Sequence, residues 1–515
     1  MIRRAIAISF FILTLLQPGF AQDESPAVDW QMVNSIREEG LQRSQLAATL
    51  SYMTDVLGAR YTLSRDMQRA QQWAVAEMNR IGLMNTAIEP FMDYGVSWDN
   101  EYFSLHMLEP DYQPMVGYPL ANTPGTSGVQ QVPVVIVDAR TQQNLERYRG
   151  KLQGVAVLST PPAAIDLTRF SKGVTRWTDE QLRELEQPAP PETPRPSPTP
   201  RNPDVLSAVD QIAFFKSEGA VIVLESRSGW PGAVRGFARP GTKVDNWSRE
   251  GNLNSLPIVA VTPEHYNRMY RILARDIPVI IEVEIRNQIG DVVEQASNVL
   301  GSIPGSDLAD ELVMLGAHFD TWHASPNASD NTSGVAVMLE AVRILKAVGV
   351  EPRRTIRVAL WAGEEQGIFG SREYVRKHFG DPNDSEIGVT PAHESFSVYF
   401  NQDYGPGQYR GIYLQGNESA RRMFTAWSEP FRDLGMTTVS PRGVGSTDHV
   451  PFDNVGLPAF QFLQDRVGGT GGHTNLDYFD TLPLDDLRKN AVIIASFVYH
   501  AAMSNERIPR KRMAR

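Results

Sequence analysis

Short, mainly apolar runs in the second half of the chain constrain its fold more than any other feature. The clearest of them span 312–315, 355–361, 396–400 and 458–463. Runs of this length without strict alternation are typical of strands that are covered on both faces, as in parallel sheets. We therefore expect an α/β fold in which a mostly parallel-centred mixed sheet is flanked by helices.

Residues able to bind metals follow each of these runs. They are His318 and Asp320, then Glu364 and Glu365, then Asp403 and, after a glycine-rich loop, His473. Asp330 differs, because the apolar spacing of the following residues up to 345 places it at the start of an amphipathic helix. Ligands of open α/β sheets collect outside the carboxyl ends of the strands, so we expect these positions to meet in one crevice.

This set of side chains predicts a metal centre. Imidazole nitrogen and carboxylate oxygen are the usual non-thiolate ligands of zinc, and two imidazoles with three or four carboxylates suit a pair of divalent cations. Such cations acidify a water from a pKa of about 15.7 toward about 7, which favours metal-dependent hydrolysis. Other histidines lack such partners, and we interpret them as surface or packing residues: His323, His378, His393 and His500.

Six motifs in this order resemble peptidase family M28, the zinc aminopeptidases and carboxypeptidases. They are Gly316–Asp320, Ser329–Gly334, Trp361–Ser371, Asn401–Asp403, Ser446–Phe452 and His473–Asp477. The resemblance covers roughly residues 290–505 and implies the phosphorylase/hydrolase-like fold of zinc peptidases. It also implies two Zn²⁺ ions per chain bridged by Asp330, with His318 and Asp403 completing one site and Glu365 and His473 the other.

Two further carboxylates have catalytic roles in this interpretation. Glu364 would accept the proton of the attacking water and later pass it to the leaving amine. Asp320 would fix the tautomer of the His318 imidazole. The pair Asp448-His449 resembles a segment that lines the site in the family, but Thr447 is interposed, and its role stays open.

The predicted function is that of an exported dinuclear zinc exopeptidase acting on peptides, and specifically an aminopeptidase. Most relatives with this ligand set are aminopeptidases, and an acidic chain attracts a substrate ammonium. The alternatives are a carboxypeptidase or dipeptidase of the same family, a single-zinc acyl transferase similar to glutaminyl cyclase, and a binding protein on an inactive scaffold. Retention of all five ligands disfavours the last two, whereas the end of the peptide attacked stays open.

The middle of the chain has a different sequence pattern. Short β-rich runs occur near 132–137, 154–158, 219–224 and 257–261. It resembles a protease-associated domain inserted into the peptidase. We place the N-terminal part of the peptidase domain at 22–114, including a strand near 98–107, the insert at 115–285 and the catalytic domain at 286–505. A proline-rich stretch at 187–203 is expected to be an extended loop without substrate chemistry.

The ends and the overall charge indicate where the chain acts. Residues 1–21 have the layout of a secretory signal with cleavage after Ala21, which predicts a secreted or periplasmic enzyme without a membrane span in the mature chain. The absence of cysteine excludes disulfides and thiolate ligands. A net charge of −11 argues against nucleic acid as a partner, and the basic tail at 506–515 is expected to be solvated. Relatives with such an insert are often dimers, so a homodimer is left open.

Overall fold

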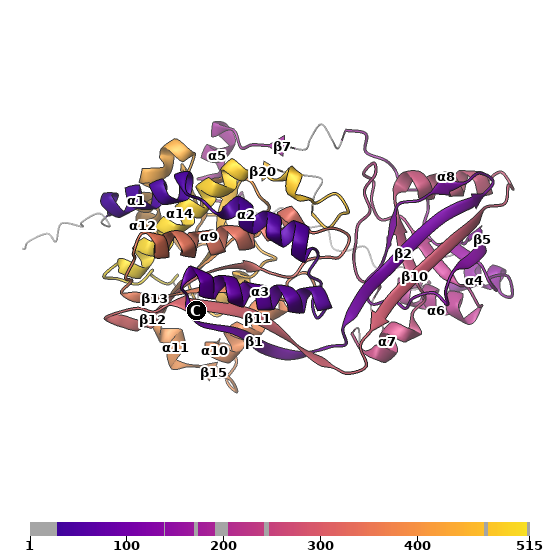
Figure 1. Cartoon of the computed structure of the whole chain (residues 1–515), viewed down its shortest axis with the longest axis horizontal. Coiled ribbons are helices and arrows are strands. Elements are labelled where there is room, and N and C mark those ends of the chain that lie inside the picture. The colour runs from indigo at the N-terminus through magenta and orange to yellow at the C-terminus, as the bar shows by residue number, and fades with distance from the viewer. Residues whose placement is uncertain are drawn as a thin grey trace, which may run out of the picture.

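The computed structural model describes residues 28–138, 140–168, 174–190, 204–240, 247–467 and 472–511. The signal segment 1–21, most of the proline-rich stretch and the last four residues of the basic tail lie outside the described residues. Two lobes are visible in Figure 1, and the chain passes between them twice, from β1 to β2 and from β10 to β11.

Within the described residues, eight strands form the sheet of the first lobe in the order β1-β11-β13-β12-β16-β19-β17-β18. Their bounds are Met84–Gly95 (β1), Glu294–Ile303 (β11), Arg354–Trp361 (β13), Leu308–His318 (β12), Phe396–Asn401 (β16), Ala459–Gln464 (β19), Tyr409–Tyr413 (β17) and Thr438–Ser440 (β18). The central strands β13, β12, β16 and β19 are parallel to one another, whereas β1, β11 and β17 join antiparallel. The expected mixed sheet with a parallel centre is confirmed.

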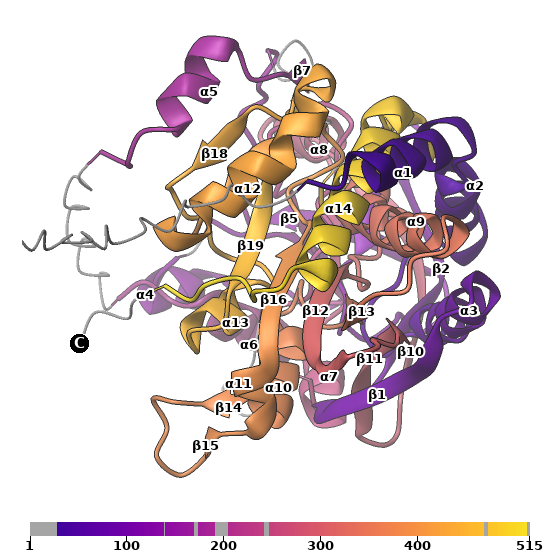
Figure 2. The same cartoon turned by 90° about the vertical axis from the view of Figure 1, so that its left-hand side faces the viewer.

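Helices cover both faces of this sheet. Those of the first lobe are α1 (Trp30–Gln42), α2 (Leu46–Ser51), α3 (Arg65–Ile81), α9 (Ser333–Ala347), α10 (Phe369–His378), α11 (Pro391–Ser395), α12 (Arg421–Ser428), α13 (Val450–Asn454) and α14 (Leu484–Met503). Figure 2 looks onto this lobe, with α9 and α14 on one side of the central strands and α10 and α11 on the other. A short hairpin of β14 (Gly380–Asp381) and β15 (Gly388–Val389) extends beyond α10.

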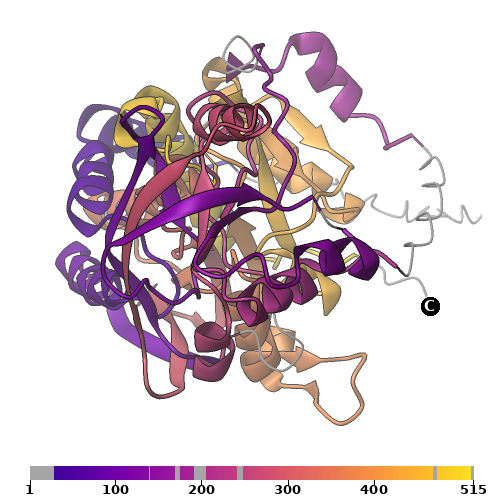
Figure 3. The same ribbon diagram turned by 90° about the vertical axis from the view of Figure 1, so that its right-hand side faces the viewer.

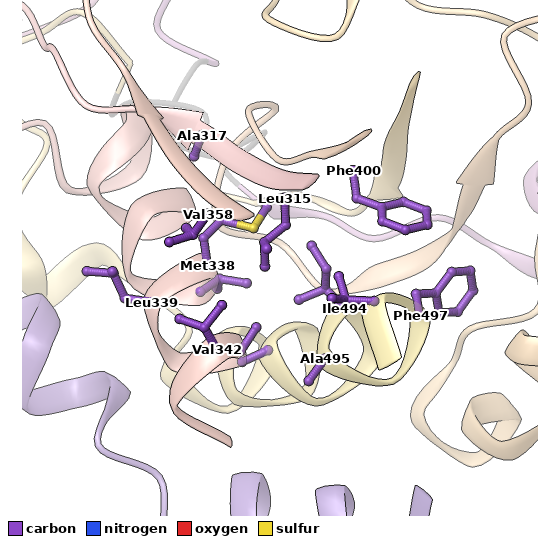
Figure 4. Packing of buried hydrophobic residues seen from close by; sticks show 14 of the residues in the cluster. Leu315, Ala317, Met338, Leu339, Val342, Val358, Phe400, Ile494, Ala495 and Phe497 are labelled. Carbon is purple, nitrogen blue, oxygen red and sulfur yellow. The ribbon is translucent and has the colours of Figure 1, made fainter. Parts of the chain in front are cut away.

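The larger core lies between the sheet and the helices α9 and α14. Leu315 and Val358 point from β12 and β13 into this layer, where they share one buried cluster with Met338 of α9 and Ile494 of α14 (Figure 4). Met314, the neighbour of Leu315, belongs to a second cluster on the opposite face. Each such side chain contributes roughly 1.5–3 kcal/mol when fully buried, so burial on both faces explains why these strands are apolar throughout.

The second lobe is built on another eight-stranded sheet of the described chain, in the order β3-β2-β10-β5-β6-β8-β9-β4. Its strands are β2 (Trp98–Glu109), β3 (Gln113–Pro114), β4 (Gly117–Pro119), β5 (Gln130–Ile136), β6 (Ala156–Leu158), β8 (Ile222–Glu225), β9 (Ile258–Val261) and β10 (Ile280–Ile289). Its helices are α4 (Gln142–Leu145), α6 (Ala208–Ser217), α7 (Arg249–Asn254) and α8 (Pro263–Leu273). The β-rich runs expected in the middle of the chain form strands β5, β6, β8 and β9.

The strand pairing places the start of this insert earlier in the chain than the expected boundary at residue 115. The strand near 98–107, which the sequence analysis assigned to the first lobe, is β2, and it pairs along its length with β10 of the second sheet. The apolar pattern of a strand does not reveal which sheet contains its partner when that partner is distant in the sequence. We therefore propose 98–289 as the extent of the second lobe.

One segment leaves the second lobe and lies on the first. Residues 174–190, which we call the strap, contain β7 (Val174–Thr175), paired antiparallel with β20 (Arg466–Val467), and helix α5 (Asp179–Leu185). Leu182 and Leu185 of α5 pack with Tyr413 and Leu463 of the first lobe. Figure 3 faces the second lobe and shows α5 set to its side.

The described part of the basic tail is docked, in contrast to the expected solvated tail. Arg507 donates to the carbonyl of Glu394, Arg510 donates to the carbonyl of His393, and Lys511 pairs with Asp453. Carbonyl and carboxylate acceptors on the first lobe therefore hold these cations in place. Among the described helices, none combines the length and the apolarity needed to cross a membrane.

Candidate active site

The seven site residues named from the sequence meet at the carboxyl edge of the parallel strands. His318 ends β12, Glu364 and Glu365 follow β13, and Asp403 follows β16. Asp330 lies in the irregular turn of Ala328–Thr332 that leads into α9. His473 comes from the loop beyond β20. The structure thus brings all of these side chains together, because adjacent parallel strands end at one edge of a sheet.

Asp330 occupies the centre of this cluster and faces two histidines with different oxygens. Its Oδ1 lies 3.3 Å from Nε2 of His318, and its Oδ2 lies 3.0 Å from Nε2 of His473. Asp403 adds an oxygen 3.3 Å from the His318 nitrogen, and Glu365 adds one 2.9 Å from the His473 nitrogen. The cluster therefore consists of two groups of ligand atoms that share one carboxylate.

Glu364 stands beside the first of these groups. Its Oε2 is 4.0 Å from Nε2 of His318, farther than the nearest oxygens of Asp330 and Asp403. It can nevertheless form a compact ligand set with His318 and Asp403. Burial raises the pKa of Glu364 well above its ordinary value, and the charge of Asp403 acts in the same direction.

The electrostatics of the cluster are those of buried charges held close together. Burial raises the pKa of Glu365 to about 7. Burial opposes the charge on His473, but its contacts with Asp330 and Glu365 outweigh that effect and raise its pKa to about 10. Protons on the imidazoles therefore balance the carboxylates in the absence of cations, and cations binding to the same lone pairs would displace them.

The donor atoms fit zinc. All are imidazole nitrogens or carboxylate oxygens, which are zinc ligands in proteins. Within the described residues, the buried Oε1 of Glu365 has no hydrogen-bond partner, which leaves an oxygen free for a cation. An unpartnered buried carboxylate oxygen is costly unless a cation or a donor satisfies it.

Asp320 acts differently from the sequence interpretation. Nδ1 of His318 hydrogen-bonds to the backbone carbonyl of Asp320 at 2.9 Å, whereas the Asp320 carboxylate is 3.9 Å from that nitrogen. The carboxylate instead accepts from the backbone N–H groups of Glu364 at 3.1 Å and Glu365 at 3.2 Å. The main chain therefore sets the imidazole tautomer, and the side chain positions the two glutamates.

Asp477 positions the segment that carries the Asp330 carboxylate, a role that the sequence analysis missed although it quoted the motif. The Asp477 carboxylate accepts from the backbone N–H and the hydroxyl of Ser329, both at 2.8 Å, and from the backbone N–H of Asp330 at 3.2 Å. Burial raises the pKa of Asp477 to about 6. Its position at the end of the motif His473–Asp477 was the only sequence signal of this role.

Arg60 is a second residue that the sequence analysis missed. It is fully buried and donates to the carbonyl of Phe319 at 2.8 Å, to that of Gly58 at 2.9 Å and to the hydroxyl of Thr332 at 2.6 Å. It thereby connects the loop after β12 to the turn that carries Asp330. Burial lowers the pKa of Arg60 to about 10. No local pattern marks an arginine so distant in the sequence from the ligands.

The pair Asp448-His449 is buried near the cluster. Asp448 accepts from the hydroxyl of Ser371 at 2.5 Å, and burial raises its pKa to about 7. Nε2 of His449 lies 3.1 Å from the carbonyl of Val444, and burial lowers its pKa to about 4. The charges of His318 and Asp403 affect the pKa of Asp448, but neither residue of the pair belongs to a ligand group of the described chain.

The second lobe contacts His473 directly. The N–H of Gly236 donates to the carbonyl of His473 at 3.1 Å, and Arg235 forms a strand bridge with Thr474. The His473 ring lies edge-on to Phe237 of the second lobe, at 5.4 Å between centroids, and to Trp322, at 6.3 Å. Residues of both lobes therefore orient this imidazole.

Comparison with known proteins agrees with this geometry. Residues 298–498 match the model of "Peptidase family M28". Carboxypeptidase Q of Homo sapiens is 21% identical over 464 residues, which are 90% of this chain and 86% of the relative. Aminopeptidase YwaD of Bacillus subtilis (strain 168) is 26% identical over 227 residues, 42% of this chain and 46% of the relative.

Solved structures show the same fold over most of the chain. A "Peptidase M28 precursor" from Shewanella amazonensis SB2B has a TM-score of 0.66 at 21% identity and covers 94% of this chain and 98% of its own. A zinc aminopeptidase from Bacillus subtilis has a TM-score of 0.54 at 18% identity and covers 89% and 94%. Both lobes are included in the similarity to the first of these.

Proposed function

We propose that this chain, whose residues 298–498 match peptidase family M28, acts as a metallopeptidase of that family and specifically as a two-zinc exopeptidase. The observation that carries the proposal is the position of Asp330. Its two oxygens face His318 at 3.3 Å and His473 at 3.0 Å, on opposite sides of one carboxylate. A carboxylate shared between two ligand groups is suited to bridging two cations.

His318, Asp330 and Asp403 would hold one zinc ion, and Asp330, Glu365 and His473 the other. When bound, the ions supply an acidified water and polarise the scissile carbonyl. Three ligand carboxylates and one hydroxide would balance the four positive charges, which keeps the cluster stable in a partly dry pocket. No further charged ligand is required, so Glu364 is not needed for metal binding and can act as a base.

Glu364 is proposed as the general base. Its Oε2 lies 4.0 Å from Nε2 of His318, beside the first ligand group, where a carboxylate can accept a proton from a bound water and then return it. Its backbone N–H is held by Asp320, so the side chain starts from a fixed position. It would take the proton of the attacking water and deliver it to the leaving amine.

An aminopeptidase is the proposed specificity. The chain has a net charge of −11, and the cluster concentrates carboxylates that attract a substrate ammonium. The second candidate is a carboxypeptidase or dipeptidase, which a specific observation favours: the Arg466 guanidinium lines a cavity next to the cluster. An arginine is the usual partner of a terminal carboxylate. The N-terminal sequence supports export, to the periplasm or the medium.

The test of the base is Glu364→Gln, which keeps the size of the side chain but removes its basicity. We expect a loss of roughly 10²–10⁴ in turnover, with two zinc ions per chain still bound in metal analysis. Glu373→Gln, on the outer helix α10, is the matched control and should retain full activity. Near-normal turnover of the first variant, or full activity with one ion per chain, would contradict the proposal.

The end of the peptide attacked is tested with blocked dipeptides. For an aminopeptidase, acetylation of the substrate amine should abolish hydrolysis, whereas amidation of the carboxyl end should matter little. The opposite result would assign the enzyme to the carboxypeptidases or dipeptidases. Light scattering on the same preparation decides between a monomer and a homodimer.

A further inference from the structure

A cavity of about 540 Å³ lies next to the segment that carries Asp403, since Tyr404 is part of its lining. Six of the residues that line it matter here: Trp177, Tyr404, Tyr413, Ser446, Gln464 and Arg466. Tyr404 directly follows the ligand Asp403, and its pKa rises to about 12, mainly through burial and also through the charges of Asp403 and Glu364. The cavity therefore adjoins the His318–Asp403 side of the cluster, and its volume is that of a small-molecule site.

Trp177 of the strap forms one wall of this cavity and is firmly held. Its backbone N–H donates to Asp465 at 2.9 Å, and its indole N–H donates to the carbonyl of Gln464 at 2.7 Å. The guanidinium of Arg410 donates to its carbonyl at 3.2 Å. The neighbouring Arg176 pairs with Asp465 at 2.9 Å and with Asp486 at 2.8 Å. The strap is therefore a fixed wall that the chain of the second lobe adds to the first.

Arg466 differs from the other arginines around this wall. Arg176, Arg410 and Arg442 all donate to acceptors of the protein, the last to the carbonyls of Glu184 and Gln187. The exposed Arg466 guanidinium lies 5.4 Å from the centre of the Trp177 ring, and no hydrogen bond or ion pair engages it within the described residues. Five N–H donors are thus available in the cavity.

Three aromatic residues contribute to the rest of the lining. Trp177, Tyr404 and Tyr413 supply ring surfaces, and the Tyr404 hydroxyl is already engaged by the carbonyl of Gly445. Burial raises the pKa of Tyr413, so its hydroxyl stays neutral and adds no negative charge. The free charge that the cavity offers to a ligand is consequently positive.

We propose that this cavity is a substrate subsite for a peptide group that carries a carboxylate, with Arg466 as its counter-ion and Trp177 as its wall. The inference rests on the proposed function, since a peptide must be bound at the cluster for the cavity to receive part of it. The carboxylate has two sources in a peptide, an acidic side chain and the free carboxyl end. Guanidinium and carboxylate form paired hydrogen bonds in either case.

The test compares kcat/KM of the zinc-loaded full chain on peptides that differ only in one carboxylate. Glu-Ala against Gln-Ala tests the acidic side chain, and Gln-Ala against Gln-Ala-amide tests the carboxyl end. In Arg466→Met, which keeps an apolar stem against Trp177, the preference for the carboxylate member of one pair should fall about tenfold. The pair affected identifies the source. Arg183→Met, which removes an exposed guanidinium from the same strap, should keep both preferences.

Retention of both preferences in Arg466→Met, or equal losses on all three peptides, would overturn the subsite. A binding measurement separates this failure from failure of the proposed function. Calorimetry with 3-phenylpropionate, and with its amide as the neutral reference, should show about tenfold weaker binding of the acid to Arg466→Met. Equal affinity would overturn the subsite even if the wild-type chain cleaved every peptide. If the chain cleaved none, the exopeptidase proposal would fail while this binding result still decided the subsite.

Discussion

Replacing Asp320 by asparagine tests how the loop after β12 supports the proposed metal centre. The Asp320 side chain is fully buried, and its two oxygens accept from the backbone N–H groups of Glu364 at 3.1 Å and Glu365 at 3.2 Å. Asparagine preserves the shape but has a single acceptor oxygen. Its amide nitrogen would therefore face one of these N–H donors.

The magnitude follows from these two hydrogen bonds. A hydrogen bond to a charged group is worth about 1.5–3 kcal/mol, and a buried donor left without a partner costs about 1–3 kcal/mol. The total of roughly 2.5–6 kcal/mol would be shared between the stability of the fold and the position of the two glutamates. Loss of a group that orients a metal ligand weakens metal binding by about tenfold to a hundredfold.

The assay is a stepwise titration of the metal-free protein with zinc, followed by calorimetry. Glu365→Ala and Asp403→Ala each remove one ligand of one proposed site. The titration step that each variant weakens is thereby assigned to that site. In Asp320→Asn we expect the step that depends on Glu365 to weaken by about tenfold to a hundredfold. The step that depends on Asp403 should change little, because the backbone carbonyl of residue 320 still holds the imidazole of His318.

Selective weakening of the Asp403 step would refute this reasoning. It would mean that the Asp320 carboxylate acts through the His318 imidazole, as the sequence alone suggested. Asp433→Asn is the control for the chemical change, because Asp433 is exposed and pairs with Arg37 far from the site. Both zinc-binding steps should be unaffected in this control.

Three other predictions concern residues around the site and at the surface. Asp477→Asn should weaken both titration steps, because Asp477 positions the shared ligand Asp330; weakening of one step alone would disagree with bridging. Arg60→Met should lower the free energy of unfolding in urea by roughly 3–5 kcal/mol, because three acceptors would lose their donor, and a loss below about 1 kcal/mol would show that these contacts contribute little. Burial opposes the charge on Glu89, but hydrogen bonds from His378 and Lys377 outweigh that effect and lower the pKa of Glu89 to about 2. Its stabilisation is thus present above pH 4.5 and lost as the pH falls toward 2, so Glu89→Gln should cost about 1 kcal/mol at pH 7, allowing for partial exposure, and nothing near pH 2.

The strands and the meeting of the candidate ligands at one edge of the sheet were predictable because both leave local signals. An apolar run such as 312–315 identifies a buried strand, and a histidine directly after it must lie at the carboxyl edge of the sheet. The boundary of the second lobe was not predictable in this way. The pairing of β2 with β10 joins residues far apart in the sequence, and the burial of β10 and of the second half of β2 alternates as in any half-buried strand.

The support of the site was less accessible from the sequence than its ligands. Arg60 comes from the N-terminal helical region, and only folding places it against Phe319. The distinction between the carbonyl and the carboxylate of Asp320 depends on backbone direction, which residue identity does not encode. The strap was likewise hidden, because the docking of Trp177 depends on acceptors in β19 and the residue after it.

The strand bridge between Arg235 and Thr474 joins the second lobe to the loop that carries His473. Two binding events that act on one segment are thermodynamically reciprocal. If contact with the second lobe increases the cation affinity at His473 by some factor, a bound cation increases the stability of the contact between the lobes by the same factor. The metal content of the protein would then regulate more than chemistry, since the ion would also act as a latch between the two halves of the molecule.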